Sequence, residues 1–264
     1  MHLSIIIPAY NERHRLTAMM DPYSEYFIGK YHDEVELIVV VNGSIDQTED
    51  LAYRYAKTHP QVRVIVEPES IGKGGAIIRG AQMARGEWVG FVDADGATPP
   101  EAFDELLQQV GDAGAIIASR WIPGADVSPP QPLSRRVASR IFNFLVRLLF
   151  RVPIHDTQCG AKLMRGDALR TVLPELGITR WAFDVDLLFK LRRAGFRIVE
   201  HPTTWHDVAG SKINVPRASI EMFLAICRLR LLYSPLRWIV TLYDLTLGRL
   251  CRRERSPRPC VGGE

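Results

Sequence analysis

Hydrophobic residues along the first hundred positions fall into four short runs separated by segments of mixed polarity. The runs cover residues 3–7, 36–41, 62–66 and 87–92, and each is nearly continuous rather than alternating. Runs of this kind are typical of strands buried on both faces, as in parallel sheets covered by helices. A helix-like segment follows each run after a short loop. The pattern therefore predicts an α/β fold with a mostly parallel central sheet and right-handed connections.

The second half of the chain predicts shorter strands and more helix. Strands are expected at 115–118, 163–164 and 196–200. No apolar run reaches the roughly 20 residues that span a bilayer, so the segment after residue 216 predicts an interfacial helical hairpin that breaks at Ser234–Pro235. We expect one domain over 1–215, an amphipathic helical segment over 216–250 and a disordered basic tail over 251–264.

The segment 134–151 predicts a helix that is amphipathic and strongly basic. It has no acidic residue and five arginines, at positions 135, 136, 140, 147 and 151. Its apolar residues recur at helical spacing, at Val137, Ile141, Phe144, Leu145 and Leu148. Two interpretations stay open. The helix lies on a membrane surface or meets an anionic ligand, or it packs its apolar stripe on the core and leaves its arginines in solvent.

Composition supports a globular chain, and the distribution of charge adds to this picture. Hydrophobic residues make up 47% and charged residues 24%. The net charge is only +3, but the part from Trp205 onward has ten Lys and Arg against five Asp and Glu. A basic end on a near-neutral body predicts an anionic surface or ligand, not general binding of nucleic acid. The four cysteines lack metal-binding spacing and the chain shows no secretory signal, so we expect reduced thiols and a cytoplasmic location.

The fourth apolar run ends in two aspartates, Asp93 and Asp95, with Gly96 directly after them. Residues two apart at the end of an extended strand point the same way, so both carboxylates would face one site. That site would lie at the carboxyl edge of the sheet, where open α/β folds bind ligands. Paired carboxylates repel each other unless a cation or a proton lies between them, which favours a divalent metal ion. The alternative is an ordinary turn.

Two further motifs lie where helices are expected to begin. Residues 72–75 read Gly-Lys-Gly-Gly and predict either a phosphate cradle or a flexible loop that needs positive φ. Asp184 and Asp186 open a later helix, on which they would point about 200° apart, so only one can face a given pocket. We take Asp184 as the acceptor-side residue and Asp186 as a structural partner, with an acidic first helical turn as the alternative.

Seven motifs taken together indicate a family. They read PAYNE at 8–12, NGSIDQT at 42–48, GKG at 72–74, DADGAT at 93–98, SR at 119–120, DTQCGAK at 156–162 and GSK at 210–212. With them, over roughly residues 3 to 215, the chain resembles family 2 glycosyltransferases, which are inverting, metal-dependent enzymes of the Rossmann-like GT-A fold that use nucleotide-diphosphate sugars. It looks most like the dolichyl-phosphate β-glucosyltransferase branch, with dolichyl-phosphate mannose synthases as near relatives.

The resemblance implies roles for residues on the donor side. Nucleotide-sugar binding would involve Pro8, Tyr10, Glu12, Asn42, Gly72, Lys73 and Asp93. Asp93 and Asp95 would hold Mg²⁺ or Mn²⁺ beside the diphosphate, and Asp95 would be catalytic. The chain departs from the family at Val41–Asn42, where two acids are usual. The nucleotide base, uridine or guanosine, therefore stays open.

On the acceptor side, the resemblance implies that Arg120, together with Arg135 or Arg136, meets an acceptor phosphate. Arg120, Asp184 and Lys212 would be catalytic, with Lys212 closing on the phosphates from a mobile loop. A phosphate monoester carries about −1.5 to −2 charges at neutral pH, so it can attack the anomeric carbon without a general base. Asp184 is then optional as a base.

Three hypotheses follow. The first is transfer of a sugar, with UDP-glucose as the expected donor, to a polyprenyl phosphate by a protein peripheral to the cytoplasmic face of the membrane. The second is the same donor chemistry on a soluble or glycan hydroxyl, with Asp184 as the general base. The third is a membrane-peripheral protein that binds nucleotide sugar without catalysis because its Val41–Asn42 pocket is altered.

Overall fold

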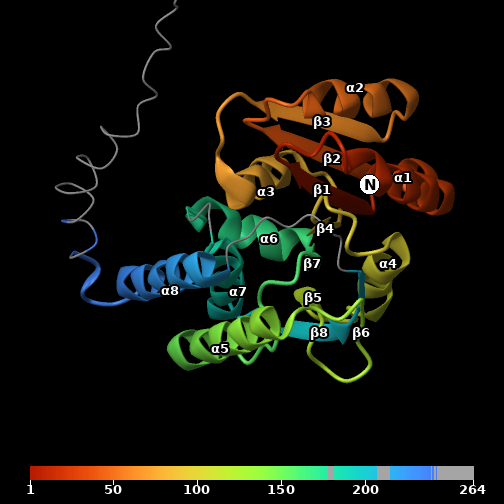
Figure 1. The fold of residues 1–264 in the computed structure, drawn as a ribbon. Coiled ribbons are helices and arrows are strands. Elements are labelled where there is room, and N and C mark those ends of the chain that lie inside the picture. Colours follow the sequence, from red (N-terminus) through yellow and green to blue (C-terminus); the bar gives the residue numbers. More distant parts are fainter. Residues whose placement is uncertain (178–180, 207–214, 239, 241, 243–264) are drawn as a thin grey trace, which may run out of the picture.

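The computed structural model describes residues 1–177, 181–206, 215–238, 240 and 242 (Figure 1). Strands and helices alternate through the first half, as the hydrophobic pattern predicts. In chain order they are β1 (Leu3–Ala9), α1 (Leu16–Tyr31), a 3₁₀ helix (His32–Glu34), β2 (Val35–Asn42), α2 (Thr48–Thr58), β3 (Val62–Glu67), α3 (Gly72–Met83), β4 (Trp88–Phe91) and α4 (Pro100–Gln109).

The second half adds shorter strands and helices of 7 to 18 residues. They are β5 (Ala115–Ser119), β6 (Asp126–Ser128), α5 (Leu133–Phe150), β7 (Lys162–Arg165), α6 (Gly166–Val172), a second 3₁₀ helix (Leu173–Glu175), α7 (Phe183–Arg193), β8 (Ile198–Pro202), β9 (Thr204–His206) and α8 (Val215–Leu232). The strands predicted at 115–118, 163–164 and 196–200 are confirmed as β5, β7 and β8.

Seven strands of the described chain form one sheet, in the order β3-β2-β1-β4-β7-β5-β8. All neighbours pair in parallel except β7, which is antiparallel to both β4 and β5. Consecutive residues of β1 enter opposite cores: Ile5 packs in the cluster with α1, α2 and α4, and Ile6 packs in the cluster with α3, α6 and α7. The predicted α/β fold with a mostly parallel sheet, covered on both faces, is therefore confirmed.

Pro8 does not end the first strand, which continues to Ala9. The predicted end at Ile7 was wrong because no hydrogen bond of the sheet requires an N–H donor at Pro8. The Val92 N–H donates to the Ile6 carbonyl, so the polar groups of Ile6, and of Pro8 two residues on, point toward β4. The β4 strand has already ended at Phe91, while pairing with β2 continues on the other side. A missing N–H is tolerated where no partner strand faces it.

The basic helix α5 leaves most of its predicted apolar stripe exposed. Val137, Ile141, Phe144 and Leu148 are 49–64% accessible, and only Leu145 of the stripe is half-buried against the core. The helix packs instead through Phe142, Val146 and Phe150. The interpretation in which the stripe covers the core is wrong.

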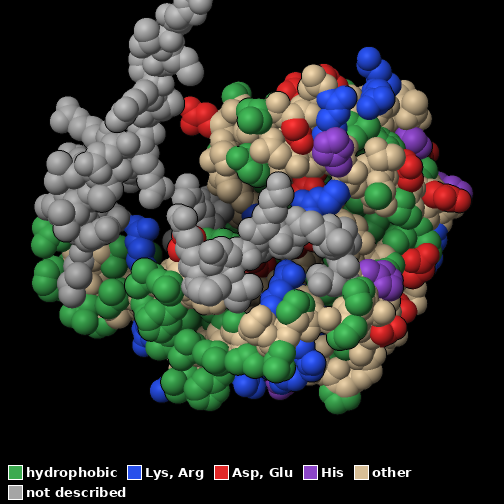
Figure 2. Space-filling view, in the orientation of Figure 1, with side chains coloured by type: hydrophobic (Ala, Val, Ile, Leu, Met, Phe, Trp, Pro, Cys, Tyr) green, Lys and Arg blue, Asp and Glu red, His purple; other side chains and the backbone are tan. Residues whose placement is uncertain are grey.

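Helix α8 lies beside α5 and shares a buried cluster with α5 and α7 (Figure 1). Figure 2 shows hydrophobic side chains gathered over the α5 and α8 region, at the lower left of the view. The chain leaves helical structure at 233–236, which confirms the break expected at Ser234–Pro235. Among the described residues, no helix combines the length and apolar character needed to cross a membrane. The division into 1–215, 216–250 and 251–264 stays a prediction, and the tail lies outside the described residues.

Candidate active site

A cavity of about 680 Å³ lies at the carboxyl ends of β1, β2 and β4, which we call the first cavity. Parallel strands end together at this edge, and the loops that follow them carry the motifs found in the sequence. Every residue predicted to bind the nucleotide sugar lines it, and so do Asp95 and Asp184: Pro8, Tyr10, Glu12, Asn42, Gly72, Lys73, Asp93, Asp95 and Asp184. The fold thus brings together positions up to 176 residues apart in sequence, from Pro8 to Asp184.

The loops after β1 and β2 are bound to each other at one side of the first cavity. The Asn11 N–H donates to Ser44 Oγ, and the Ile45 N–H donates to Asn11 Oδ1. One residue further along, the Glu12 N–H donates to Thr48 Oγ1 at 2.9 Å. These bonds pair the PAYNE and NGSIDQT motifs directly, so the two loops form one wall of the cavity.

Asn42, where the family usually has an acid, is buried at the end of β2. Its Nδ2 donates to the Ala9 carbonyl at 3.2 Å, which fixes the orientation of the amide. Among the described residues, Asn42 Oδ1 has no hydrogen-bond partner. The position therefore offers a neutral acceptor rather than a carboxylate, and its part in reading the base stays a prediction.

Asp93 and Asp95 follow β4 but do not lie on it. The strand ends at Phe91, and Ala94 and Asp95 form a turn in which the Ala97 N–H donates to Asp95 Oδ1. The expectation that both carboxylates face one site is confirmed, but the reason given for it, strand alternation, was wrong. The turn and the shared cavity occur together, so the two interpretations of this motif do not exclude each other.

Gly160 of the DTQCGAK motif makes room for Asp93. A Cβ atom at this glycine would lie 2.3 Å from Asp93 Oδ2, closer than two unbonded atoms can approach.

The pKa of the Asp95 carboxyl lies above its ordinary value. Burial raises it, and so does the negative charge of Asp93. The site holds two like charges close together in partly desolvated surroundings.

The paired aspartates fit a divalent cation that takes its other ligands from elsewhere. Among the described residues, no three or more His, Cys, Asp or Glu side chains are arranged to hold a metal ion. Mg²⁺ in proteins commonly uses one or two carboxylates and completes its shell with substrate phosphates and water. Asp93 and Asp95 supply that number of ligands, in the cavity predicted to bind a diphosphate.

In the part of the chain that the structure describes, Lys73 forms an ion pair with this site, with its Nζ 2.5 Å from Asp93 Oδ1. Burial lowers the pKa of the Lys73 ammonium, but the charges of Asp93 and Asp184 outweigh it and raise that pKa above the ordinary value. The glycine loop around it forms the first turn of α3, and Gly72 has a φ of +76°. The motif therefore needs the backbone freedom of glycine and also presents a helix N-terminus to the cavity.

Asp184 is bound from the core side by Lys162, which was not among the predicted site residues. Lys162 Nζ donates to Asp184 Oδ1 at 2.6 Å and to the Cys159 carbonyl at 2.7 Å. Burial raises the pKa of Asp184, but Lys162 and then Lys73 outweigh it and hold that pKa below the ordinary value. A lysine inside a buried strand was a signal that could have revealed this pair.

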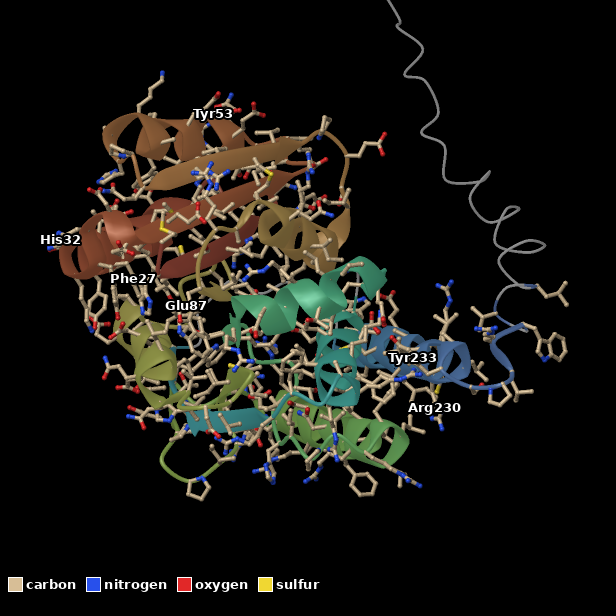
Figure 3. The ribbon with its side chains drawn as sticks, turned by 180° about the vertical axis from the view of Figure 1, so that it is seen from behind. Phe27, His32, Tyr53, Glu87, Arg230 and Tyr233 are labelled. Atoms are coloured by element: carbon tan, nitrogen blue, oxygen red, sulfur yellow. The ribbon has the colours of Figure 1, made fainter. Side chains whose placement is uncertain are left out.

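Asp186 lies away from the first cavity, as a spacing of two on a helix requires. It accepts hydrogen bonds from Lys190 Nζ at 3.2 Å and from the Tyr233 hydroxyl. Figure 3 labels Tyr233 where α8 meets α7. Asp186 thus links the C-terminal end of α8 to the helix that carries Asp184, which confirms its expected structural role.

A second cavity, of about 520 Å³, lies between α5 and α8 and is lined mainly by apolar side chains. Of the described cations, Arg120 and Arg135 line it, whereas Arg136 is exposed and does not. Gln158 and Trp181 line both cavities, and Gln158 Nε2 donates to the Trp181 carbonyl at 3.1 Å. The two cavities are therefore neighbours that share a wall.

Arg120 is fixed in the second cavity by a buried carboxylate. Its Nε and Nη2 donate to the two oxygens of Asp156 at 2.7 and 3.0 Å, and its guanidinium lies 5.3 Å from the ring centre of Trp205. Such a bidentate pair sets the orientation of the guanidinium plane. Lys212, the remaining predicted site residue, lies outside the described residues.

Known proteins resemble this chain in sequence over most of its length. The dolichyl-phosphate β-glucosyltransferase of Dictyostelium discoideum is 33% identical over 245 residues, 88% of this chain and 75% of the relative. The protein of the same name from Drosophila melanogaster is 37% identical over 226 residues, 81% of this chain and 69% of the relative.

The fold is also that of a solved GT-A structure, glucosyl-3-phosphoglycerate synthase from Mycobacterium tuberculosis in complex with Mn²⁺, UDP and phosphoglyceric acid. The two share a TM-score of 0.63 at 19% identity, over 88% of this chain and 78% of the other. The family model for glycosyl transferase family 2 matches residues 4–173. Because the match covers more than half of the chain, and includes the ends of β1, β2 and β4 that build the first cavity, the chain belongs to glycosyl transferase family 2.

Proposed function

We propose that this glycosyltransferase moves glucose from UDP-glucose to a polyprenyl phosphate such as dolichyl phosphate, at the cytoplasmic surface of a membrane. The observation that carries the proposal is the second cavity. It combines an apolar lining from α5 and α8 with Arg120 and Arg135, and it shares Gln158 and Trp181 with the first cavity. An isoprenoid chain with a phosphate at one end has the same two properties.

The relatives support the same acceptor and sugar, since those from Dictyostelium discoideum and Drosophila melanogaster are named dolichyl-phosphate β-glucosyltransferases. The exposed stripe on α5 supports a peripheral position at a membrane. Val137, Ile141, Phe144 and Leu148 form an apolar row on a helix rich in arginine, which suits an interface with anionic lipid.

On the donor side we propose that Asp93 and Asp95 hold Mg²⁺ or Mn²⁺ together with the donor diphosphate. When bound, the ion would neutralise charge that develops on the leaving nucleoside diphosphate. Lys73 and the N-terminus of α3 lie in the same cavity and would bind the diphosphate oxygens. Pro8, Tyr10, Glu12 and Asn42 would surround the nucleoside, on the wall formed by the two paired loops.

On the acceptor side, Arg120 and Arg135 would hold the phosphate of the lipid so that one oxygen faces the anomeric carbon. The carbon–oxygen bond to the acceptor forms as the bond to the diphosphate breaks, with inversion at the anomeric carbon. A phosphate oxygen needs no base to become a nucleophile. The low pKa of Asp184 also makes that carboxylate a weak proton acceptor, which favours a phosphate over a hydroxyl acceptor.

The test is transfer itself. The protein is incubated with UDP-[¹⁴C]glucose, Mg²⁺ or Mn²⁺ and a polyprenyl phosphate, and organic-extractable label is counted. We expect extractable label with the phosphate and none with the matching polyprenol. Parallel reactions with GDP-mannose test the base and the sugar. Absence of lipid-linked sugar with every common donor would refute the proposal, and donor binding by calorimetry without turnover would support the non-catalytic hypothesis instead.

The hydroxyl-acceptor hypothesis is separated by Asp184→Asn. A general base contributes about 10² to 10⁴ in rate, so its loss would reduce turnover by that factor if Asp184 were the base. With a phosphate acceptor, we expect a smaller loss, about tenfold, from altered charge in the first cavity. Transfer to polyprenyl phosphate and to water-soluble glycans is measured with the same donor, so that each acceptor is judged separately.

A further inference from the structure

Lys162 is a charged residue in the middle of the protein core. It lies on β7, where it pairs with Phe91 of β4 and Ile117 of β5, and its side chain is 0% accessible. A buried ammonium without partners would be costly, so a lysine is kept at such a position only with compensating contacts. Within the described chain Lys162 has three: Asp184 Oδ1, the Cys159 carbonyl and the ring of Phe91, whose centre is 5.2 Å from Nζ.

Lys162 itself does not line the first cavity, but one of its partners does. Asp184 lines that cavity, and hydrogen bonding to Lys162 occupies its Oδ1. Lys162 therefore acts on the cavity through Asp184. It binds Oδ1 of the carboxylate from the core side and keeps a positive charge 2.6 Å from that oxygen.

The charged groups around Asp184 come from several elements. Lys162 faces it from β7 and Lys73 from α3, and Lys73 is in turn bound to Asp93 after β4. On α7 itself, Asp186 accepts hydrogen bonds from Lys190 and Tyr233 away from the cavity. The ammonium groups of Lys162 and Lys73 both lie near the ring of Phe91, with Lys73 Nζ 5.8 Å from the ring centre. Charges of alternating sign thus run from the core to the paired aspartates.

We propose that Lys162 is a positioning residue of the transfer reaction, which fixes Asp184 as an anion with one oxygen held from the core and its other side toward the donor. In that state Asp184 accepts hydrogen bonds and balances the charge of Lys73, and it does not exchange a proton during turnover. The inference deepens the proposed function by assigning a residue to the same site, and its effect on transfer rests on that function.

The first experiment measures the titration midpoint of the Asp184 carboxyl without any substrate. Protein labelled with ¹³C at the aspartate carboxyl groups is titrated by NMR, and Asp184→Asn identifies the Asp184 signal. A cation at this distance lowers a carboxyl pKa by about 1 to 3 units, so Lys162→Met should raise the Asp184 midpoint by at least about one unit. Lys162→Arg keeps the charge and should hold the midpoint near the wild-type value. An unchanged midpoint in Lys162→Met would overturn the proposal.

The second experiment follows kcat/KM for transfer against pH. In Lys162→Met the acidic limb should move to higher pH, so that the loss is largest at low pH and partly recovered above neutrality. A purely structural lysine would give the same fractional loss at every pH, and that result would count against the proposal. Because the NMR titration needs no turnover, its outcome stands even if the wild-type protein proves to use another acceptor.

A double variant keeps the test decisive if Lys162→Met alone does not fold. Lys162→Met with Asp184→Asn removes both charges of the pair, which proteins tolerate better than one unpaired buried charge. If Lys162 acts through Asp184, the double variant should match Asp184→Asn in kcat/KM within about threefold. A further loss of tenfold or more, in protein that unfolds at a similar temperature, would show a role independent of Asp184 and overturn the proposal.

Discussion

Lys73 Nζ and Asp93 Oδ1 lie 2.5 Å apart in the first cavity, so the ammonium occupies one of the two carboxylates proposed to hold a divalent ion. A metal ion that binds Asp93 has to share this carboxylate with Lys73 or displace it. The diphosphate of a donor offers Lys73 a new partner at the same moment. Binding of the metal and of the donor should therefore favour each other.

Lys73→Met should raise the affinity for Mn²⁺ in the absence of donor, because the competing cation is gone. The same variant should bind UDP-glucose about tenfold more weakly, because charged hydrogen bonds to the diphosphate are lost. Free Mn²⁺ is measured by electron paramagnetic resonance with and without UDP-glucose, and binding of UDP-glucose is measured by calorimetry. Arg79→Met, on the same helix but paired with Glu67 outside the cavity, is the matched control and should change neither value. Weaker Mn²⁺ binding by Lys73→Met would contradict the competition.

Gly160→Ala should impair catalysis by moving the Asp93 carboxylate. The added methyl would lie 2.3 Å from Asp93 Oδ2 and force it aside by about 1 Å, and such a displacement in an active site can cost about 10² in rate. We expect kcat/KM to fall by that order and the concentration of Mn²⁺ needed for half-maximal activity to rise. Gly29→Ala is the control, since no atom lies within 4 Å of the added methyl there. Full activity of Gly160→Ala would show that Asp93 has room to adjust.

Adjacent arginines on α5 separate binding of the acceptor from general charge. Arg135 lines the second cavity and Arg136 is exposed. Arg135→Ala should raise the KM for polyprenyl phosphate about tenfold, with the KM for the donor unchanged, because one charged contact to the phosphate is worth about 1.5 to 3 kcal/mol. Arg136→Ala changes the net charge equally and should leave both constants within about twofold. Equal effects of the two substitutions would mean that the helix attracts the lipid only by its overall charge.

The donor side of the site was predictable from sequence because each motif lies at the carboxyl end of a strand or in the loop that follows it. Once a parallel sheet is inferred, Pro8, Asn42 and Asp93 must meet at one edge. The sequence left the turn at Asp95 open as an alternative but placed the end of β4 too late, because only four residues of β4 pair while the apolar run continues to Val92. Periodicity reports which residues are apolar, but it does not report where a neighbouring strand ends.

The core side of the site could not be derived in this way. Lys162 and Asp184 are 22 positions apart, and their pairing depends on β7 running antiparallel between β4 and β5. Nothing in the local pattern of a four-residue strand specifies its direction. The α5 stripe shows the same limit, because helical spacing identifies an apolar face but does not say whether that face meets the core or solvent.

Asp104 should give the fold a stability that depends on pH. This buried carboxylate of α4 accepts hydrogen bonds from Lys30, Tyr31, Tyr26 and Gln108, and although burial raises its pKa, these bonds hold it below the ordinary value. A lowered folded-state pKa means that the stabilisation is complete above the unfolded value of about 3.9 and is lost as the pH falls through the folded value.

Asp104→Asn should therefore lower the free energy of unfolding by about 2 kcal/mol at pH 7, and the difference from wild type should shrink below about pH 4. Urea unfolding of the variant and of wild type at pH 7, 5, 4 and 3 measures this difference in the free energy of unfolding. Asp112→Asn, which breaks an exposed pair with Arg197, is the control and should change stability little. A difference that stays constant down to pH 3 would show that the charge of Asp104 is not what stabilises the seam between α1 and α4.

The exposed stripe of α5 should set the affinity of the protein for membranes. Phe144 and Leu148 are 57% and 64% accessible, so polar substitutions there remove little packing from the core. Burying such a side chain in lipid contributes about 1.5 to 3 kcal/mol, and Phe144→Ser with Leu148→Ser should weaken binding to vesicles with anionic lipid by tenfold or more. Sedimentation with the vesicles measures the bound fraction. Ile45→Ser removes an even more exposed apolar residue from the opposite half of the sequence and should leave binding unchanged. If the double variant binds vesicles as wild type does but transfers glucose poorly, the stripe serves the acceptor rather than the membrane.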